Sequence, residues 1–210
     1  MRVSRFMQTS VVTVPSDTLI TEAQKIMQEN GIRRLPVVDR GRLVGIVTRS
    51  KLRDVAPSVA TSLSVWELNY ALSRIKVVEV MESEVVTIAP SATIEEAAAI
   101  MAERRIGAMP VMENNKLVGI VTATDLFRLL IDVLGVRQPG ARIQIVEPYK
   151  DKPFGALSEI FARHQVKILS VFTYTDPVTL CQDMVLRVAT DAAAFVTDAL
   201  KENGFRVVEA

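Results

Sequence analysis

Leu43-Val44-Gly45-Ile46-Val47-Thr48 decides the fold, because the same six residues return 74 positions later as Leu117-Val118-Gly119-Ile120-Val121-Thr122. The same shift aligns residues 7–52 with residues 81–126 without a gap, and 20 of the 46 aligned pairs are identical. A repeated unit of this size buries its apolar face against its neighbour and not alone. The sequence therefore predicts two similar copies packed as a pseudo-symmetric pair, with clefts between them.

Each copy is predicted to run strand, helix, strand, strand, helix. Short β-branched and apolar runs predict the strands, at Val11–Val14, Leu35–Val38 and Leu43–Val47 and again at Val85–Ile88, Met109–Met112 and Leu117–Val121. Apolar residues at helical spacing follow the candidate N-caps, which are Asp17 or Thr18 in the first copy and Ser91 or Thr93 in the second. Arg40-Gly41 and Asn114-Asn115 are typical of hairpin turns. A second helix is expected after each returning strand.

The rest of the chain divides at two places. Residues 59–77 join the copies and contain a predicted helix at Ser64–Arg74, in which Trp66 is expected to be a packing anchor. Gly135–Gly140 is rich in glycine and proline and predicts a domain boundary. Beyond it, residues 141–210 are predicted to run β-α-β-β-α-β, which forms an antiparallel sheet with two helices on one face.

Composition limits the kinds of function. Lys plus Arg number 25 and Asp plus Glu number 24, a balance that argues against a nucleic-acid or polybasic membrane surface. The first residues carry no apolar signal-peptide core and no apolar run is long enough to span a membrane, so we expect a cytoplasmic protein. Cys181 and His164 are the single cysteine and the single histidine. Cysteine-rich or histidine-rich metal sites are therefore not expected, and no metal is required.

Together these motifs resemble the CBS domain, and the pair resembles a Bateman module. The resemblance rests on Val-Val-Thr-Val, Glu-Ala-x-x-x-Met, Pro-Val-Val-Asp and Leu-Val-Gly-Ile-Val-Thr, which begin at Val11, Glu22, Pro36 and Leu43. Ala60–Asn69 resembles the linker of bacterial acetoin-utilisation proteins, in which two CBS repeats precede an ACT domain. Residues 151–157 are similar to the ACT turn Asp-x-Pro-Gly-x-Leu, with Phe154 inserted between proline and glycine.

The resemblance implies a mixed α+β or α/β chain of four parts. Residues 1–58 and 78–135 are two CBS-type β-α-β-β-α repeats, residues 59–77 are a linker helix, and residues 141–210 are a ferredoxin-like, ACT-type domain. CBS pairs bind adenosine compounds between their repeats. The expected ligand is therefore AMP, ADP or ATP, with NADH or S-adenosylmethionine as alternatives. A link to acetoin or carbon metabolism follows from the same resemblance.

One cleft, named the Asp125 cleft, is expected to bind the ligand. Thr122-Ala123-Thr124-Asp125 matches the family's Ser/Thr-x-x-Asp motif, which assigns the phosphate to Thr122 and Thr124 and the ribose to Asp125. A carboxylate accepts strong hydrogen bonds from two vicinal hydroxyls, and a helix start suits a phosphate. The same positions are good helix caps, and both roles can coexist. By the family's head-to-tail arrangement, the other residues of this cleft are Val12, Thr13, Ile32, Arg33, Arg34 and Ile120; for the two arginines a solvated loop is the alternative.

The pseudo-equivalent cleft, named the Lys51 cleft, departs from the motif. Its residues by the same arrangement are Thr48, Lys51, Val86, Thr87, Ile106 and Gly107. Lys51 stands where the second copy has Asp125, and an ammonium group cannot accept a hydrogen bond from a ribose diol. This cleft is therefore expected to be a weaker second site, either empty or occupied by a more anionic ligand. The prediction is one adenosine site per chain.

The leading hypothesis is a regulatory, non-enzymatic protein that senses an adenine nucleotide through the CBS pair. The ACT-like domain is expected to form a homodimer through the sheet edges at Val166–Tyr174 or Phe205–Glu209, or else to bind a small ligand such as an amino acid. The remaining expected partner is an unidentified regulated protein, with neither nucleic acid nor a membrane. Two alternatives are an interaction scaffold with empty clefts and an enzyme that uses Cys181 or a serine or threonine as nucleophile, with His164 as base.

Overall fold

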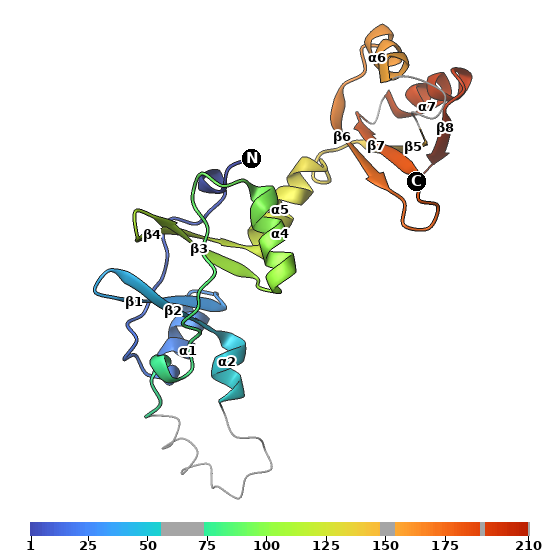
Figure 1. Ribbon diagram of the computed structural model, residues 1–210. Coiled ribbons are helices and arrows are strands. Elements are labelled where there is room, and N and C mark those ends of the chain that lie inside the picture. Colours follow the sequence, from blue (N-terminus) through green and yellow to red (C-terminus); the bar gives the residue numbers. More distant parts are fainter. Residues whose placement is uncertain (56–73, 148–153, 190–191, 210) are drawn as a thin grey trace, which may run out of the picture. The chain divides into compact units, whose positions relative to one another are not determined.

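The computed structural model describes residues 1–55, 74–147, 154–189 and 192–209 (Figure 1). The chain forms two compact units, Met1–Leu126 and Phe127–Ala210. The predicted boundary at Gly135–Gly140 lies inside the second unit. Two predictions fall outside the described residues: the linker helix with Trp66, as far as residue 73, and the ACT-type turn at residues 151–153.

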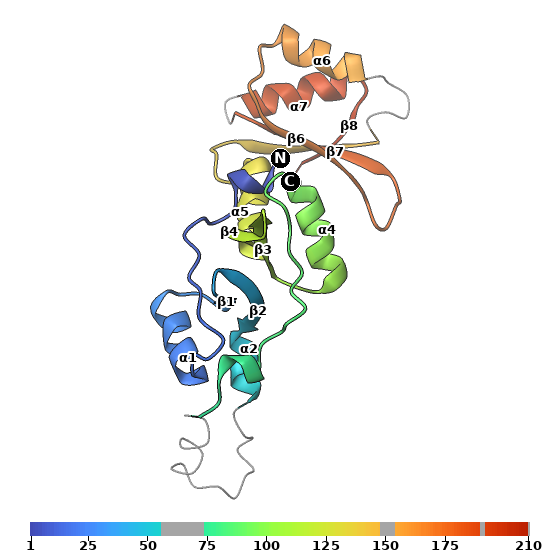
Figure 2. The same cartoon turned by 60° about the vertical axis from the view of Figure 1, so that its left-hand side comes forward.

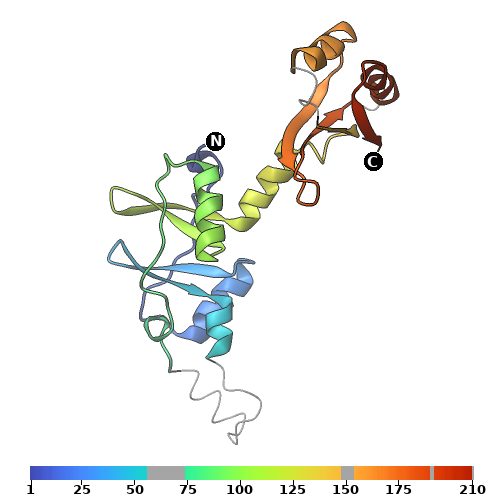
Figure 3. The ribbon, with the colours of Figure 1, turned by 45° about the vertical axis from the view of Figure 1, so that its right-hand side comes forward.

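Each copy in the first unit is built on a two-stranded antiparallel hairpin. The hairpins pair β1 (Arg34–Asp39) with β2 (Arg42–Thr48) and β3 (Ala108–Glu113) with β4 (Lys116–Thr122). Both turns have positive φ at their two central residues, 49° and 78° at Arg40 and Gly41 and 49° and 60° at Asn114 and Asn115. Such turns follow the right-handed twist of the flanking strands. The predicted hairpins are therefore confirmed, and they lie side by side within the unit (Figure 3).

Helices complete each copy in the predicted order. They are α1 (Ile20–Glu29) and α2 (Arg49–Asp54) in the first copy, and α4 (Ile94–Arg104) and α5 (Ala123–Val133) in the second. Short 3₁₀ turns precede the copies, η1 (Val3–Arg5) and η2 (Val77–Glu79). Most of the apolar residues at helical spacing in α1 and α4 are buried, as at Ala23 and Ala97, whereas Ile26 and Ile100 are partly buried.

The two predicted N-caps have different outcomes. Thr93 caps α4, and it exchanges two hydrogen bonds with Glu96 in a reciprocal capping box. The prediction of Asp17 or Thr18 for α1 is wrong, because the helix begins only at Ile20. The Ile20 N–H donates instead to the carbonyl of Ile75, at 3.0 Å, so a distant segment replaces the side-chain cap.

The runs Val11–Val14 and Val85–Ile88 are not strands, contrary to the prediction. Only Val14 and Ile88 pair within their own copy, each through an isolated parallel bridge. Just before the first run, Gln8 pairs with Ile120 of the opposite copy, and the pseudo-equivalent residue before the second run does the same. The runs therefore cross from one copy to the other and have no continuous neighbouring strand.

The segment that precedes each copy packs on the other copy. The Val3 N–H donates to the Ala92 carbonyl at 2.9 Å, and the Val77 N–H donates to the Thr18 carbonyl at 2.8 Å. Both valine side chains are completely buried. Val77 belongs to the apolar cluster of the first copy, although it lies just before the second copy in the sequence. The two copies are therefore interlocked by an exchange of their leading segments.

A glycine of the repeated motif permits the close approach of the copies. Gln8 and Ile120 exchange two backbone hydrogen bonds of 2.9 Å. Next to them Met7 lies over Gly119, where a Cβ atom would overlap the methionine sulfur. The pseudo-equivalent residues of the other copy make the same contacts. The identity of these positions between the copies thus has a steric cause.

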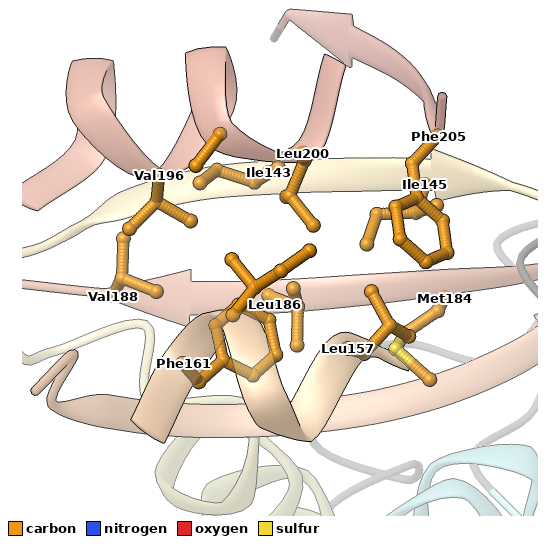
Figure 4. Packing of buried hydrophobic residues seen from close by; sticks show 12 residues of the cluster. Ile143, Ile145, Leu157, Phe161, Met184, Leu186, Val188, Val196, Leu200 and Phe205 are labelled. Atoms are coloured by element: carbon orange, nitrogen blue, oxygen red, sulfur yellow. The ribbon is translucent and has the colours of Figure 1, made fainter. Parts of the chain in front are cut away.

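The second unit has the predicted β-α-β-β-α-β order of elements. These are β5 (Ala141–Val146), α6 (Phe154–Arg163), β6 (Ile168–Thr175), β7 (Gln182–Val188), α7 (Ala193–Glu202) and β8 (Arg206–Glu209). The sheet is antiparallel with strand order β6-β7-β5-β8, and both helices cover the same face (Figure 2). Leu157 and Phe161 of α6 and Leu200 of α7 pack there against Ile145 and Leu186 of the sheet (Figure 4).

Within the described parts of the chain, none of the helices combines the length and the apolar character needed to cross a membrane.

Candidate functional site

The Thr122–Asp125 turn joins β4 to α5 and holds its carboxylate firmly. Asp125 Oδ2 accepts hydrogen bonds from the Thr122 N–H at 2.9 Å and from Thr122 Oγ1 at 2.6 Å. The Asp125 N–H donates in return to Thr122 Oγ1 at 3.3 Å. The carboxylate is partly buried at the start of a helix, which is where the sequence placed it. Its position is thus set by the backbone that it caps.

These contacts show that the helix-cap role of the motif is real. The pattern is the one that Thr93 and Glu96 make at the start of α4, where no ligand role is expected. In the cap around Asp125, Oδ2 carries both accepted hydrogen bonds. A carboxylate has about four lone-pair sites, so capping alone does not exhaust its capacity to accept. The capping and ribose roles are therefore compatible.

The other residues assigned to the Asp125 cleft lie on β4, on the first turn of α5 or on the segment that runs between the copies. Ile120 is two residues before the turn on β4, and its backbone pairs with Gln8. Val12 and Thr13 lie on the segment that runs from Gln8 to the bridge at Val14, so they cross between the copies. Thr124 is exposed on the first turn of α5.

Ile32 and Arg33 are held to their own copy by Arg49. The carbonyl of Ile32 accepts from Arg49 Nη2 at 3.2 Å, and the carbonyl of Arg33 accepts from the Arg49 N–H at 2.9 Å. In the second copy the carbonyl of Gly107 accepts from the Ala123 N–H at 3.1 Å. The loop that precedes each hairpin is thus hydrogen-bonded to the start of the helix that follows the same hairpin. These two segments of one copy therefore lie next to each other.

A cavity of about 260 Å³ lies at the Lys51 cleft. Five of the six residues that the sequence assigned to this cleft line it, namely Thr48, Lys51, Val86, Ile106 and Gly107. Thr87 is not among the lining residues. The lining comes from the helix start of the first copy and from the loop before β3 of the second copy, so the cavity is built head to tail between the copies.

The Lys51 cavity has a mixed charge. Its cations are Arg34, Lys51 and Arg105, and its carboxylates are Asp54, Glu82 and Glu84. Lys51 Nζ lies 3.8 Å from Glu82 Oε1, and both side chains are about half exposed. An exposed pair of this kind is weak and open to exchange with a ligand. Three carboxylates therefore remain near the cavity although the motif position itself holds a lysine.

Arg34 lies at the Lys51 cleft, whereas the sequence assigned it to the Asp125 cleft. Its guanidinium lines the Lys51 cavity and lies directly over Gly107 of the other copy. Adjacent residues of an extended segment point to opposite sides, so Arg33 and Arg34 are not expected to share a cleft. Two effects lower the pKa of Arg34 from its ordinary value: burial, which has the larger effect, and the nearby positive charge of Arg33. The cavity thus contains a guanidinium that has lost part of its hydration.

Sequence reasoning also missed Arg105, Asp54, Glu82 and Glu84 as lining residues. One signal was present for Arg105, because its partner in the repeat is Gly31, and both have positive φ, 53° and 63°. Glycine adopts this conformation without strain, whereas arginine does not. Arg105 is the C-cap of α4, so its left-handed conformation is set by the end of the helix.

The second unit contains a separate cavity of about 350 Å³ beside β5, α7 and β8, with Arg142 and Asp198 in its lining. His164 stacks edge-on against Phe195 with ring centroids 4.3 Å apart, and Cys181 Sγ lies 3.5 Å from the Thr179 carbonyl oxygen. Both contacts are structural in kind. Among the described residues, no group of three His, Cys, Asp or Glu side chains could hold a metal ion.

Comparison with known proteins gives matches to the two copies of the repeat. Residues 3–58 and 77–132 each match the family model described as CBS domain. Inosine-5'-monophosphate dehydrogenase from Korarchaeum cryptofilum is 34% identical over 145 residues, which cover 69% of this chain. The match spans only 27% of that relative's length.

Two solved structures have a similar fold. The CBS domain pair of protein MJ0100, in complex with 5'-methylthioadenosine and S-adenosyl-L-methionine, has a TM-score of 0.53 and 27% identity and covers 66% of this chain and 98% of its own. A Vibrio cholerae protein named for a proposed role in acetoin utilization (AcuB) has a TM-score of 0.55 and 27% identity and covers 66% and 96%.

Proposed function

Because this chain belongs to the CBS-domain family, we propose that it is a regulatory protein whose two repeats bind an adenosine-containing ligand between them. The single observation that carries the proposal is the carboxylate of Asp125, fixed at a strand-to-helix turn. Ligand binding would favour one arrangement of the interlocked repeats over another by differential affinity.

The chemistry of the turn supports this ligand class. A ribose diol donates to a carboxylate, and the exposed hydroxyl of Thr124 at the start of α5 can donate to a phosphate. The Thr122 hydroxyl donates its single proton to Asp125, so it positions the carboxylate. Ile120 supplies an apolar side chain for a base. That the similar MJ0100 pair was solved with two adenosine compounds supports the same class of ligand for this chain.

A calorimetric titration of the intact chain tests the proposal. AMP, ADP, ATP, NADH and S-adenosylmethionine are titrated separately, with guanosine monophosphate as the matched control for the base. We expect saturable binding of at least one adenosine compound and weaker binding of the guanosine compound. Absence of heat and of thermal stabilisation with every ligand would favour the interaction scaffold with empty clefts.

We also propose that the second unit acts as an ACT-type domain that joins two copies of the chain. The strand order places β6 and β8 at the two sheet edges, as predicted. β6 has eight residues, none of them charged, and it exposes Ile168 and Val171. Charges normally protect an edge strand from pairing, so β6 is better suited to side-by-side association than β8, which carries Arg206 and Glu209. A link to acetoin utilisation rests on the resemblance to AcuB.

Val171→Lys should convert the intact chain from dimer to monomer. The lysine places a charge on the uncharged edge strand, and Val171 is half exposed, so the fold should tolerate it. Light scattering after size exclusion measures the mass. Val208→Lys on β8 is the matched control and should leave the dimer intact. A dimer that survives Val171→Lys and is lost in Val208→Lys would assign the interface to the other edge.

A further inference from the structure

We infer that Met7 and Met81 form a redox-sensitive lock between the two copies, which a peroxide opens by oxidising their thioethers to sulfoxides. The two methionines are the first aligned pair of the repeat, and each lies just before the run that crosses between the copies. The lock consists of these methionines and of the glycines that they contact. It needs no bound ligand.

The methionines of this chain differ in their exposure to solvent. All eight lie in the described parts of the chain, and four of them are buried, namely Met27, Met101, Met109 and Met184. Met1 is exposed, whereas Met7, Met81 and Met112 are partly buried. Oxidation follows exposure, so a peroxide, which is a small molecule, should reach Met7 and Met81 and spare the buried four.

The thioether sulfur of each lock methionine lies against a glycine of the opposite copy. A Cβ atom at Gly119 would be 2.6 Å from the Met7 sulfur and 3.0 Å from the carbonyl oxygen of the next residue. Met81 makes the same contact with Gly45, and it also packs against the apolar cluster of the first copy. Both sulfurs thus occupy places that stay open only because the opposing residue has no side chain.

Oxidation changes the size and the polarity of this contact. The sulfur lone pair attacks one peroxide oxygen and the O–O bond breaks. The other oxygen leaves as water, with the proton of the transferred oxygen, so that sulfur is oxidised by two electrons and the peroxide is reduced. The sulfoxide oxygen accepts hydrogen bonds and has no proton to donate. At Gly119 it would meet the Gln8 carbonyl, which is also an acceptor, so the oxidised side chain is expected to leave this place.

The backbone pairs that join the copies are next to these sulfurs. Gln8 and Ile120 exchange two hydrogen bonds of 2.9 Å, and Ile46 and Glu82 do the same. Ile120 also lies two residues before Thr122, where the motif of the Asp125 cleft begins. Displacement of the methionines should therefore loosen both pairs and alter the cleft beside one of them.

Hydrogen exchange of the intact chain tests the lock. Hydrogen peroxide is added until peptide mass spectrometry shows oxidation at Met7 and Met81, and exchange is followed at the four backbone amides that pair the copies. We expect exchange at these amides to become about 10-fold faster, the effect of a typical destabilising change. Treatment with the two methionine sulfoxide reductases, one for each epimer, should restore slow exchange.

The double variant Met7→Leu/Met81→Leu is the matched control, because leucine keeps an apolar contact of similar volume and has no sulfur. Its exchange should stay slow after peroxide. Met112→Leu removes the third partly buried methionine, on β3, and should leave the peroxide effect at full size. Unchanged exchange in a chain oxidised at both lock positions would overturn the inference. A peroxide effect that persists in the double variant, or that disappears in Met112→Leu, would do the same.

The consequence for ligand binding rests on the proposed function. The oxidised chain should bind AMP more weakly than the reduced chain, because Ile120 is proposed to contact the base and its backbone pairs with Gln8. A chain that binds no AMP in either state would remove the adenosine site. The exchange rates would still decide whether the lock exists.

Discussion

Asp125→Ala should lower the affinity of the intact chain for AMP by about 100-fold or more. The carboxylate is expected to accept from both ribose hydroxyls, and each hydrogen bond to a charged group contributes about 1.5–3 kcal/mol. The substitution also removes the cap formed with Thr122, which costs about 1 kcal/mol of stability. Isothermal titration calorimetry measures the first effect, and thermal unfolding measures the second.

Glu96→Ala separates these two effects. Glu96 makes the same reciprocal cap with Thr93 at the start of α4, with hydrogen bonds of 2.7 and 3.1 Å, but has no proposed ligand. Its loss should therefore lower the unfolding temperature by a similar amount while the affinity for AMP stays unchanged. Equal losses of affinity in Glu96→Ala and Asp125→Ala would assign the effect to capping and remove the ribose role from Asp125.

Val77→Asp should destabilise the first unit by about 3–5 kcal/mol, since an unpaired charge would be buried in the apolar cluster of the first copy. The expected fall in unfolding temperature is roughly 10–20 °C. Differential scanning calorimetry of the intact chain measures it. The prediction tests the exchange of leading segments, because Val77 lies just before the second copy in the sequence but packs in the first copy.

Val78→Asp is the matched control, one residue further along the same 3₁₀ turn. Its side chain is 48% exposed, so a charge there stays hydrated and the unfolding temperature should hardly change. If both substitutions lowered stability alike, the turn would be sensitive to charge in general, and burial of Val77 in the first copy would not explain the result.

The local structure was predictable where neighbouring residues determine it. The hairpins at Arg40-Gly41 and Asn114-Asn115 follow from residues that accept positive φ, and the faces of α1 and α4 follow from apolar spacing. The crossing runs at Val11–Val14 and Val85–Ile88 were mistaken for strands, because a β-branched run reads alike whether or not a neighbour pairs with it.

The sequence predicted the motif residues of the candidate site but not all of the residues that line the cavity. Matching the repeats identified Thr122 and Asp125 and contrasted the latter with Lys51. The cavity, however, depends on Arg34, whose direction is set by its register on β1, and on Gly107 of the other copy, which leaves space for it. The sequence alone does not show how closely Arg34 of one copy approaches Gly107 of the other.

The amino-acid sequence by itself determined the repeat, the hairpins and helices of the first unit, the order of elements in the second unit, and the asymmetry between aspartate and lysine at the motif position. Those properties reside in spacing and side-chain chemistry along one stretch of chain. Only the tertiary structure decided that the copies exchange their leading segments and that Arg34 lies over Gly107. Both depend on contacts between residues far apart in the chain, which packing selects and local propensity does not.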